Sequence, residues 1–167
     1  MKLWITILLI FLATGCNTNQ EKMTKIVFLH HSTGEAIWKG KTNRYVYRLT
    51  GRGDVQRFFN YHNRKNKTNY EISARNFPKS TPYGWNNYPF DYYNIWVKNA
   101  GAQPFMDEPT LEMLTPEYDV IIFKHCFPVS RIVPDTGTPD INSEVKSLEN
   151  YKLQYEALKK KMHEFPD

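Results

Sequence analysis

The chain has 167 residues, of which 41% are hydrophobic and 23% are charged, and its formal net charge is +5. This length is enough for one domain with a core of its own, and the composition is that of an ordinary globular protein. Lys and Arg are scattered along the sequence, and no nucleic-acid-binding motif accompanies them. We therefore interpret the positive charge as solvated surface and expect no nucleic-acid partner.

The first residues have the organisation of a secretory signal. Lys2 precedes an almost unbroken apolar stretch at 3–13, which is too short to span a bilayer as a stable helix because that takes about 20 apolar residues. Small residues follow, and the ending Leu-Ala-Thr-Gly-Cys resembles a bacterial lipoprotein signal. The resemblance implies cleavage before Cys16 and attachment of lipid to its thiol. The alternatives are an uncleaved anchor and an ordinary signal peptide with a chance cysteine.

The chain accordingly divides into a signal peptide at 1–15, a polar tether at 16–24 and one domain at 25–167. Lipid on Cys16 would hold the protein at a membrane of the bacterial cell envelope, facing the periplasm or the cell surface. Cys126 would then be the one remaining thiol, so we expect no intramolecular disulfide and a fold that depends on its core.

Alternating strand and helix patterns predict an α/β domain with a parallel sheet. Strands are predicted at 26–29, 70–74 and 120–123; the first and third are runs of four apolar residues, typical of strands buried on both faces. Further predicted elements are a helix capped by Asp54 with Val55, Phe58, Phe59 and His62 on its inner side, helical structure from about 91 to 99, a helical turn at 111–114, and a long amphipathic helix capped by Asn142 or Ser143.

Polar side chains follow the first and the third predicted strand. The sequence His-His-Ser stands at 30–32, and Lys-His-Cys stands at 124–126. If the strand order is second, first, third, the two groups lie side by side at the carboxyl edge of the sheet. Open α/β sheets bind their ligands at such an edge, so we expect the functional site there.

One interpretation of this edge is a serine hydrolase. Ser32 would be the nucleophile, and backbone N–H groups of Ser32 and Gly34 would stabilise the oxyanion. The sequences Phe-Leu-His-His-Ser-Thr-Gly at 28–34 and Tyr-Asp-Val-Ile-Ile-Phe-Lys at 118–124 resemble a divergent SGNH (GDSL-like) hydrolase. The resemblance implies a flavodoxin-like three-layer α/β/α fold and hydrolysis of ester bonds, deacetylation of glycans included. It implies Ser32 as the nucleophile and no cofactor.

The sequence departs from that family's pattern in three places. His30 and His31 stand where Gly-Asp precedes the family's serine, and His125 begins the segment that replaces Gly-x-Asn-Asp, so the oxyanion asparagine has no counterpart. The family's Asp-x-x-His block, which follows two further strands, is also missing from these residues. We therefore expect a partial domain with only the first three strands. It would be inactive by the family mechanism unless His125 or a neighbouring histidine serves as the base.

Two other interpretations of the same edge remain open. His30 or His31 could bind zinc together with His125 and Cys126, but no CxxC or HExxH spacing supports this, and we predict no metal. Alternatively, the histidines hydrogen-bond to backbone carbonyls and Cys126 is a small core residue.

A proline- and aromatic-rich segment at 77–93 offers a second candidate function. Its rings could stack on sugars, which would make the protein a non-catalytic glycan-binding lipoprotein acting through the loop Tyr83–Trp96. The alternative is that the rings pack the loop onto the core. The ligand-binding candidates are His31, Tyr83, Trp85, Asn86 and Tyr88.

Overall fold

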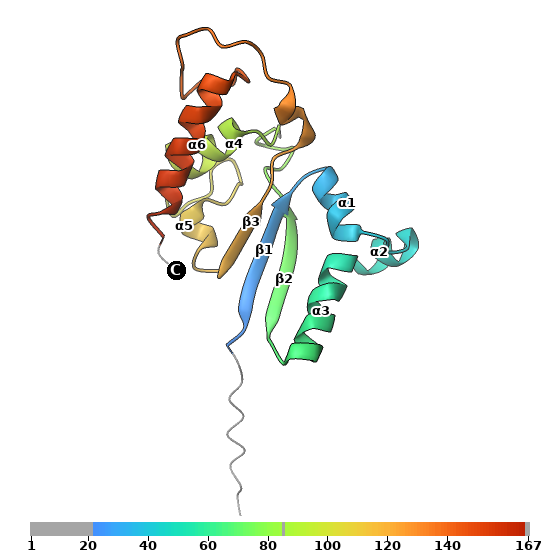
Figure 1. The fold of residues 1–167 in the computed structure, drawn as a ribbon. Coiled ribbons are helices and arrows are strands. Elements are labelled where there is room, and N and C mark those ends of the chain that lie inside the picture. The colour runs from blue at the N-terminus through green and yellow to red at the C-terminus, as the bar shows by residue number, and fades with distance from the viewer. Residues whose placement is uncertain (1–21, 85, 166–167) are drawn as a thin grey trace, which may run out of the picture.

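The computed structural model describes residues 22–84 and 86–165, which form an α/β domain around a parallel sheet. The strands are β1 (Thr24–His30), β2 (Tyr70–Asn76) and β3 (Val120–Phe123), in the order β2-β1-β3. All pairing is parallel, with Ile26 opposite both Ile72 and Val120. Helices cover both faces of the sheet (Figure 1). The three predicted strands and their predicted order are confirmed. The burial of the third strand on both faces, which its apolar run predicts, is wrong, because Val120 and Ile122 of β3 are 40% and 42% exposed.

The central strand β1 separates two hydrophobic clusters because successive side chains of a strand point to opposite faces. Val27 and Leu29 are fully buried in the cluster on one face, and Ile26 and Phe28 are buried in the cluster on the other. A strand that is covered on both faces needs an unbroken apolar run, which explains the composition of 26–29.

The helices α1 (Thr33–Lys39), α2 (Arg44–Thr50) and α3 (Asp54–Asn66) lie on one side of the sheet (Figure 1). Trp38 of α1 is buried against β1 and β2, and Val55 and Phe59 of α3 pack on the same cluster. The side chain of Phe58, which we predicted to face inward, is 62% exposed, and that prediction is wrong.

Asp54 does not cap α3, contrary to the sequence-based prediction. The cap position belongs to Gly53, where an added Cβ would lie 1.9 Å from the Trp38 carbonyl oxygen. The Asp54 carboxylate instead accepts hydrogen bonds from the Lys41 amide at 2.6 Å and the Thr42 hydroxyl at 2.7 Å. It therefore holds the loop between α1 and α2 against α3.

The other face of the sheet is covered by shorter elements and one long helix. These are α4 (Pro89–Tyr93), the π-helix η1 (Asn94–Lys98), α5 (Leu111–Leu114) and α6 (Leu148–Met162), with the 3-10 turn η2 (Phe127–Ser130) following β3. Trp96, Leu114 and Leu158 from this layer are buried on the sheet. The predicted helical structure at 91–99 and 111–114 is confirmed.

The long helix α6 begins later than its amphipathic pattern predicts. Ser147 is its cap, and the Ser147 hydroxyl accepts a hydrogen bond from the Asn150 amide at 3.3 Å. Asn142, one of the two predicted caps, lies in a turn in which its amide donates to the Asp140 carboxylate at 2.8 Å. The predicted start at Asn142 or Ser143 is wrong because side-chain hydrogen bonds hold 140–146 in turns.

Gly34 sets how closely α1 packs on the end of β1. A Cβ built on Gly34 would lie 2.3 Å from the Cβ of His30, which is far inside van der Waals contact. A larger residue would therefore push the start of α1 away from the sheet.

We expect Gly34→Ala to lower the free energy of unfolding by about 2 kcal/mol. Overpacking typically costs 1–3 kcal/mol, which exceeds the gain of about 1 kcal/mol from the better helix propensity of Ala. Urea unfolding measures the change, with Glu35→Ala at the exposed neighbouring position as the control. A Gly34→Ala protein as stable as the unmodified one would contradict this packing.

Candidate functional site

The turn between β1 and α1 presents Ser32 to solvent in a strained conformation. Ser32 has φ 46° and ψ −103°, and it is the N-terminal cap position of α1. A non-glycine residue at positive φ costs of order 1–3 kcal/mol, and such strain clusters at functional sites. Certain serine hydrolases present their nucleophile on this kind of sharp strand-to-helix turn.

The backbone of the turn is only partly hydrogen-bonded. The Gly34 amide donates to the His31 carbonyl at 2.8 Å, and the Glu35 amide donates to the Ser32 carbonyl at 2.9 Å. Gly34 N–H, one of the two expected oxyanion donors, is therefore engaged in the turn. The amides of Ser32 and Thr33 have no acceptor in the described part of the chain.

Lys124 links the ends of β1 and β3. The register pairs Leu29 with Phe123, and the Lys124 ammonium donates to the Thr33 hydroxyl at 2.8 Å. A positive charge thus lies beside the residue that follows Ser32. The expected juxtaposition of 30–32 with 124–126 is confirmed.

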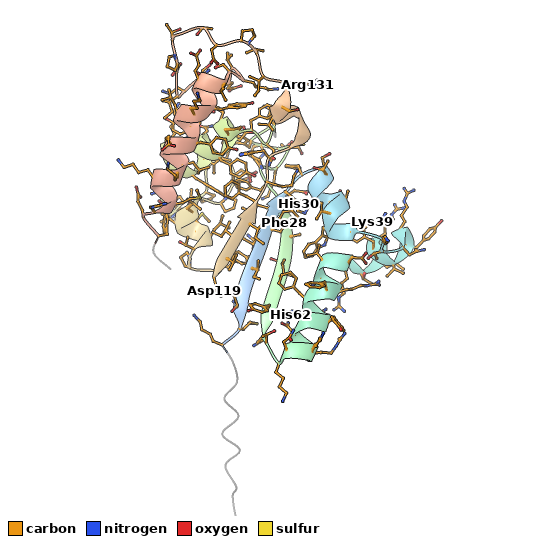
Figure 2. All side chains as sticks on the ribbon, in the orientation of Figure 1. Phe28, His30, Lys39, His62, Asp119 and Arg131 are labelled. Carbon is orange, nitrogen blue, oxygen red and sulfur yellow. The ribbon has the colours of Figure 1, made fainter. Side chains whose placement is uncertain are left out.

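His30 and His31 are both buried behind this turn, and Figure 2 shows His30 at the end of β1. His31 Nε2 contacts the Pro78 carbonyl oxygen and donates a hydrogen bond to it. His30 Nδ1 is buried without a partner among the described residues. Burial lowers the pKa of His30; the charges of His31 and Lys124 lower it further, and Glu35 acts in the opposite direction.

Three aromatic rings surround the imidazole of His125. Its ring centroid is 4.8 Å from that of Tyr92, 6.1 Å from that of Phe123 and 5.4 Å from that of Tyr155, each approached edge-on. Neither ring nitrogen forms a hydrogen bond with a described residue. Burial lowers the pKa of His125 to about 4, although the nearby backbone of Asn87 opposes the shift. His125 is therefore neutral at pH 7.

No histidine is positioned as a base on Ser32 in the described residues, since the Ser32 hydroxyl has no hydrogen bond there. A general base must come within hydrogen-bond reach of the proton that it removes. Cys126 is buried and its amide donates to the Asn87 carbonyl at 3.1 Å. The described residues hold no group of three or more His, Cys, Asp or Glu side chains placed to share a metal ion.

The aromatic loop is packed into the core for most of its length. Tyr92 and Trp96 are fully buried, and Tyr93 is nearly so. The Tyr83 hydroxyl donates to the buried Asp91 carboxylate at 3.1 Å, and the Lys146 ammonium lies 3.9 Å from the ring centroid of Tyr88. Asn86 is exposed. Two candidates, Trp85 and Cys16, lie outside the described residues.

Asn87, the neighbour of the candidate Asn86, forms hydrogen bonds that connect the aromatic loop to the carboxyl edge of the sheet. It is fully buried with φ 59°, and its side-chain amide donates to the Phe77 carbonyl at 2.7 Å and the Tyr92 hydroxyl at 3.0 Å. Together with the bond from Cys126, these contacts join the loop, α4 and the end of β3. The one sequence signal was the tolerance of Asn for positive φ.

No protein-family model matches the chain, and neither a curated protein nor a solved structure resembles it closely enough to count as a match. Among the helices of 22–84 and 86–165, none is long and apolar enough to cross a membrane.

The environment of His125 predicts a specific pH dependence of stability. Because its folded pKa lies near 4 and the unfolded value is near 6.5, its contribution is complete above pH 6.5 and is lost as the pH falls toward 4. His125→Phe keeps the ring contacts and removes the titration. We expect the loss of unfolding free energy between pH 7 and pH 4.5 to shrink by about 2 kcal/mol in this variant.

Urea unfolding at the two pH values measures this difference, and the titration of carboxylates cancels when the two proteins are compared. An identical pH dependence in both proteins would show that burial among these rings does not lower the pKa of His125 in the folded protein.

Proposed function

We propose that the protein is a lipid-anchored SGNH-hydrolase-like protein whose chemistry is ester hydrolysis, with Ser32 as the nucleophile. The observation that carries the proposal is the conformation of Ser32, which is exposed at positive φ immediately after the central strand. Gly would occupy such a turn at no steric cost, so a serine there suggests a role for its hydroxyl.

The position of Ser32 supports the same chemistry. It lies at the carboxyl edge of a parallel sheet, where β1 and β3 end side by side. Ligands of open α/β sheets bind outside this edge. An ester bound there would meet the Ser32 hydroxyl without displacing any hydrogen bond that the described residues make to it.

Lys124 is the residue that we propose to stabilise the negative charge formed during the reaction. When Ser32 Oγ forms a bond to the ester carbonyl carbon, negative charge develops on the carbonyl oxygen. A fixed positive charge or hydrogen-bond donor near that oxygen is usually the largest single contribution to catalysis. The Lys124 ammonium, held on Thr33, is suited to this role, together with the amides of Ser32 and Thr33. We propose it in place of the asparagine that the resembling family uses.

The attack also releases the Ser32 proton, and the leaving alcohol must take up a proton. His125 is enclosed by rings, and the described histidines make no hydrogen bond to Ser32 Oγ. Without a positioned base among the described residues, solvent water would accept the Ser32 proton and protonate the leaving alcohol. We accordingly expect slow acylation of Ser32.

Anchoring through lipid on Cys16 would place this site in the cell envelope, with an acyl ester, such as an acetylated glycan, as the substrate class. The alternative of glycan binding on the aromatic loop would depend on Tyr88 and Asn86, because Tyr92 and Trp96 are buried.

A fluorophosphonate probe tests the nucleophile directly, because it forms a covalent bond to an activated serine and needs no knowledge of the natural substrate. We expect slow labelling of the full chain at one site, found at Ser32 by peptide mass spectrometry. Ser32→Ala should reduce labelling to background.

Ser80→Ala, at another exposed serine, is the matched control and should label like the unmodified protein. Labelling that survives Ser32→Ala, or that maps to another residue, would exclude Ser32 as the nucleophile.

A further inference from the structure

Positive charge, expected to be dispersed over the surface, is concentrated on one layer of the fold. Residues 33–67, which span α1 to α3, contain nine Lys and Arg and only two acidic residues, a net charge of +7. The rest of the chain contains 13 basic and 15 acidic residues, a net charge of −2. The whole positive excess therefore belongs to this layer.

These cations are available to a partner. Eight of the nine are exposed and the ninth, Lys39, is half-buried. None forms an ion pair with any residue that the structure describes. Of the two acidic residues, Asp54 is engaged by the Lys41 amide and the Thr42 hydroxyl.

The outer face of α3 combines cations with aromatic rings. Five residues of α3 share the face opposite Val55 and Phe59, because helical positions three and four residues apart lie on the same side. They are Arg57, Phe58, Tyr61, Arg64 and Lys65. The rings of Phe58 and Tyr61 are 62% and 55% exposed. Figure 2 shows side chains of α2 and α3 projecting away from the sheet.

The neighbouring helices add aliphatic side chains to the same layer. Leu49 of α2 is 86% exposed and Ile37 of α1 is 57% exposed, and Tyr45 and Val46 of α2 are exposed as well. Exposed aliphatic side chains cannot stack on nucleic-acid bases, whereas they can enter the boundary between lipid headgroups and acyl chains.

The chain enters the domain beside this layer. The Thr24 amide, at the start of β1, donates to the Asn69 carbonyl at 2.8 Å, three residues beyond the end of α3. Residues between Cys16 and Thr24 can span at most about 28 Å when extended. Lipid on Cys16, if attached as proposed above, would hold the basic end of α3 close to a membrane.

We propose that the α1–α3 layer is a docking surface for an anionic lipid bilayer. Exposed Lys and Arg contact the lipid phosphates, while the side chains of Leu49, Phe58 and Tyr61 enter the interfacial region. A polybasic surface next to the anchor adds an attraction of about 1 kcal/mol per Lys or Arg and determines which face of the domain meets the bilayer. The docking does not depend on Ser32 being catalytic.

Vesicle binding of the full chain tests the proposal, with Cys16→Ser to exclude acylation. The measured quantity is the ratio of the partition coefficients for vesicles of phosphatidylcholine with 30% phosphatidylglycerol and of phosphatidylcholine alone. Because residues 3–13 are mostly apolar, we expect them to bind both vesicles alike, so the ratio reports on charge. We expect a ratio above 10 in 0.1 M NaCl, lost in 0.5 M NaCl through screening.

Replacing three cations of the α3 face, by Arg57→Gln, Arg64→Gln and Lys65→Gln, should lower the ratio at least about tenfold, toward 1, because each Lys or Arg near an anionic surface contributes about fivefold. The matched control replaces three exposed cations elsewhere, by Lys98→Gln, Lys152→Gln and Lys160→Gln, and should leave the ratio unchanged.

Equal effects of the two triple variants would overturn the proposal, as would a ratio near 1 for the unmodified surface. The proposal would also fail if the α3 cations bound a single-stranded oligonucleotide more tightly than the anionic vesicles. The salt dependence of binding is measured on the protein without the triple substitutions, so misfolding of a variant cannot affect this test.

Discussion

The close contact between Gly34 and His30 determines how the first helix leaves the sheet. Without a Cβ on Gly34, α1 packs directly on the last residue of β1, and the chain has only a short turn in which to reverse its direction. Ser32 takes the positive φ that this turn requires. Its exposed hydroxyl and the hydrogen bond from Lys124 to Thr33 both depend on that geometry. His30 and His31 are buried behind the turn.

The layers that cover the two faces of the sheet have different roles. On one face, Trp96, Tyr92 and Phe77 stack around β1 and β3, and Asn87 supplies the hydrogen bonds that hold the aromatic loop to them. That layer is a core that supports the carboxyl edge. On the other face, α1 to α3 cover β1 and β2 but carry their cations and several apolar side chains outward. We infer that this second layer orients the protein on a membrane and that the first supports the site.

The strand β1 could be predicted because a strand buried on both faces needs a continuous apolar run. The order β2-β1-β3 could be predicted because parallel strands that are close in sequence usually lie adjacent or nearly so. The start of α6 could not, because the turn at 140–146 depends on side-chain hydrogen bonds such as that between Asn142 and Asp140. At the site, the choice of Ser32 came from its place after β1. Its strained φ, the Lys124 contact and the ring enclosure of His125 depend on residues distant in sequence. Sequence-based reasoning also missed the charge of the α1–α3 layer, although residues 33–67 are contiguous and their net charge of +7 can be counted from the sequence.

The most direct test of the central claim is a crystal structure of the chain after reaction with a small fluorophosphonate. We expect a phosphonyl group bonded to Ser32 Oγ, with Ser32 still at positive φ and a phosphonyl oxygen within hydrogen-bond distance of the Lys124 ammonium. An adduct on another residue would contradict the proposed role of Ser32. An adduct on Ser32 whose phosphonyl oxygens point away from β3 and contact neither Lys124 nor the amides of the turn would contradict the proposed role of Lys124.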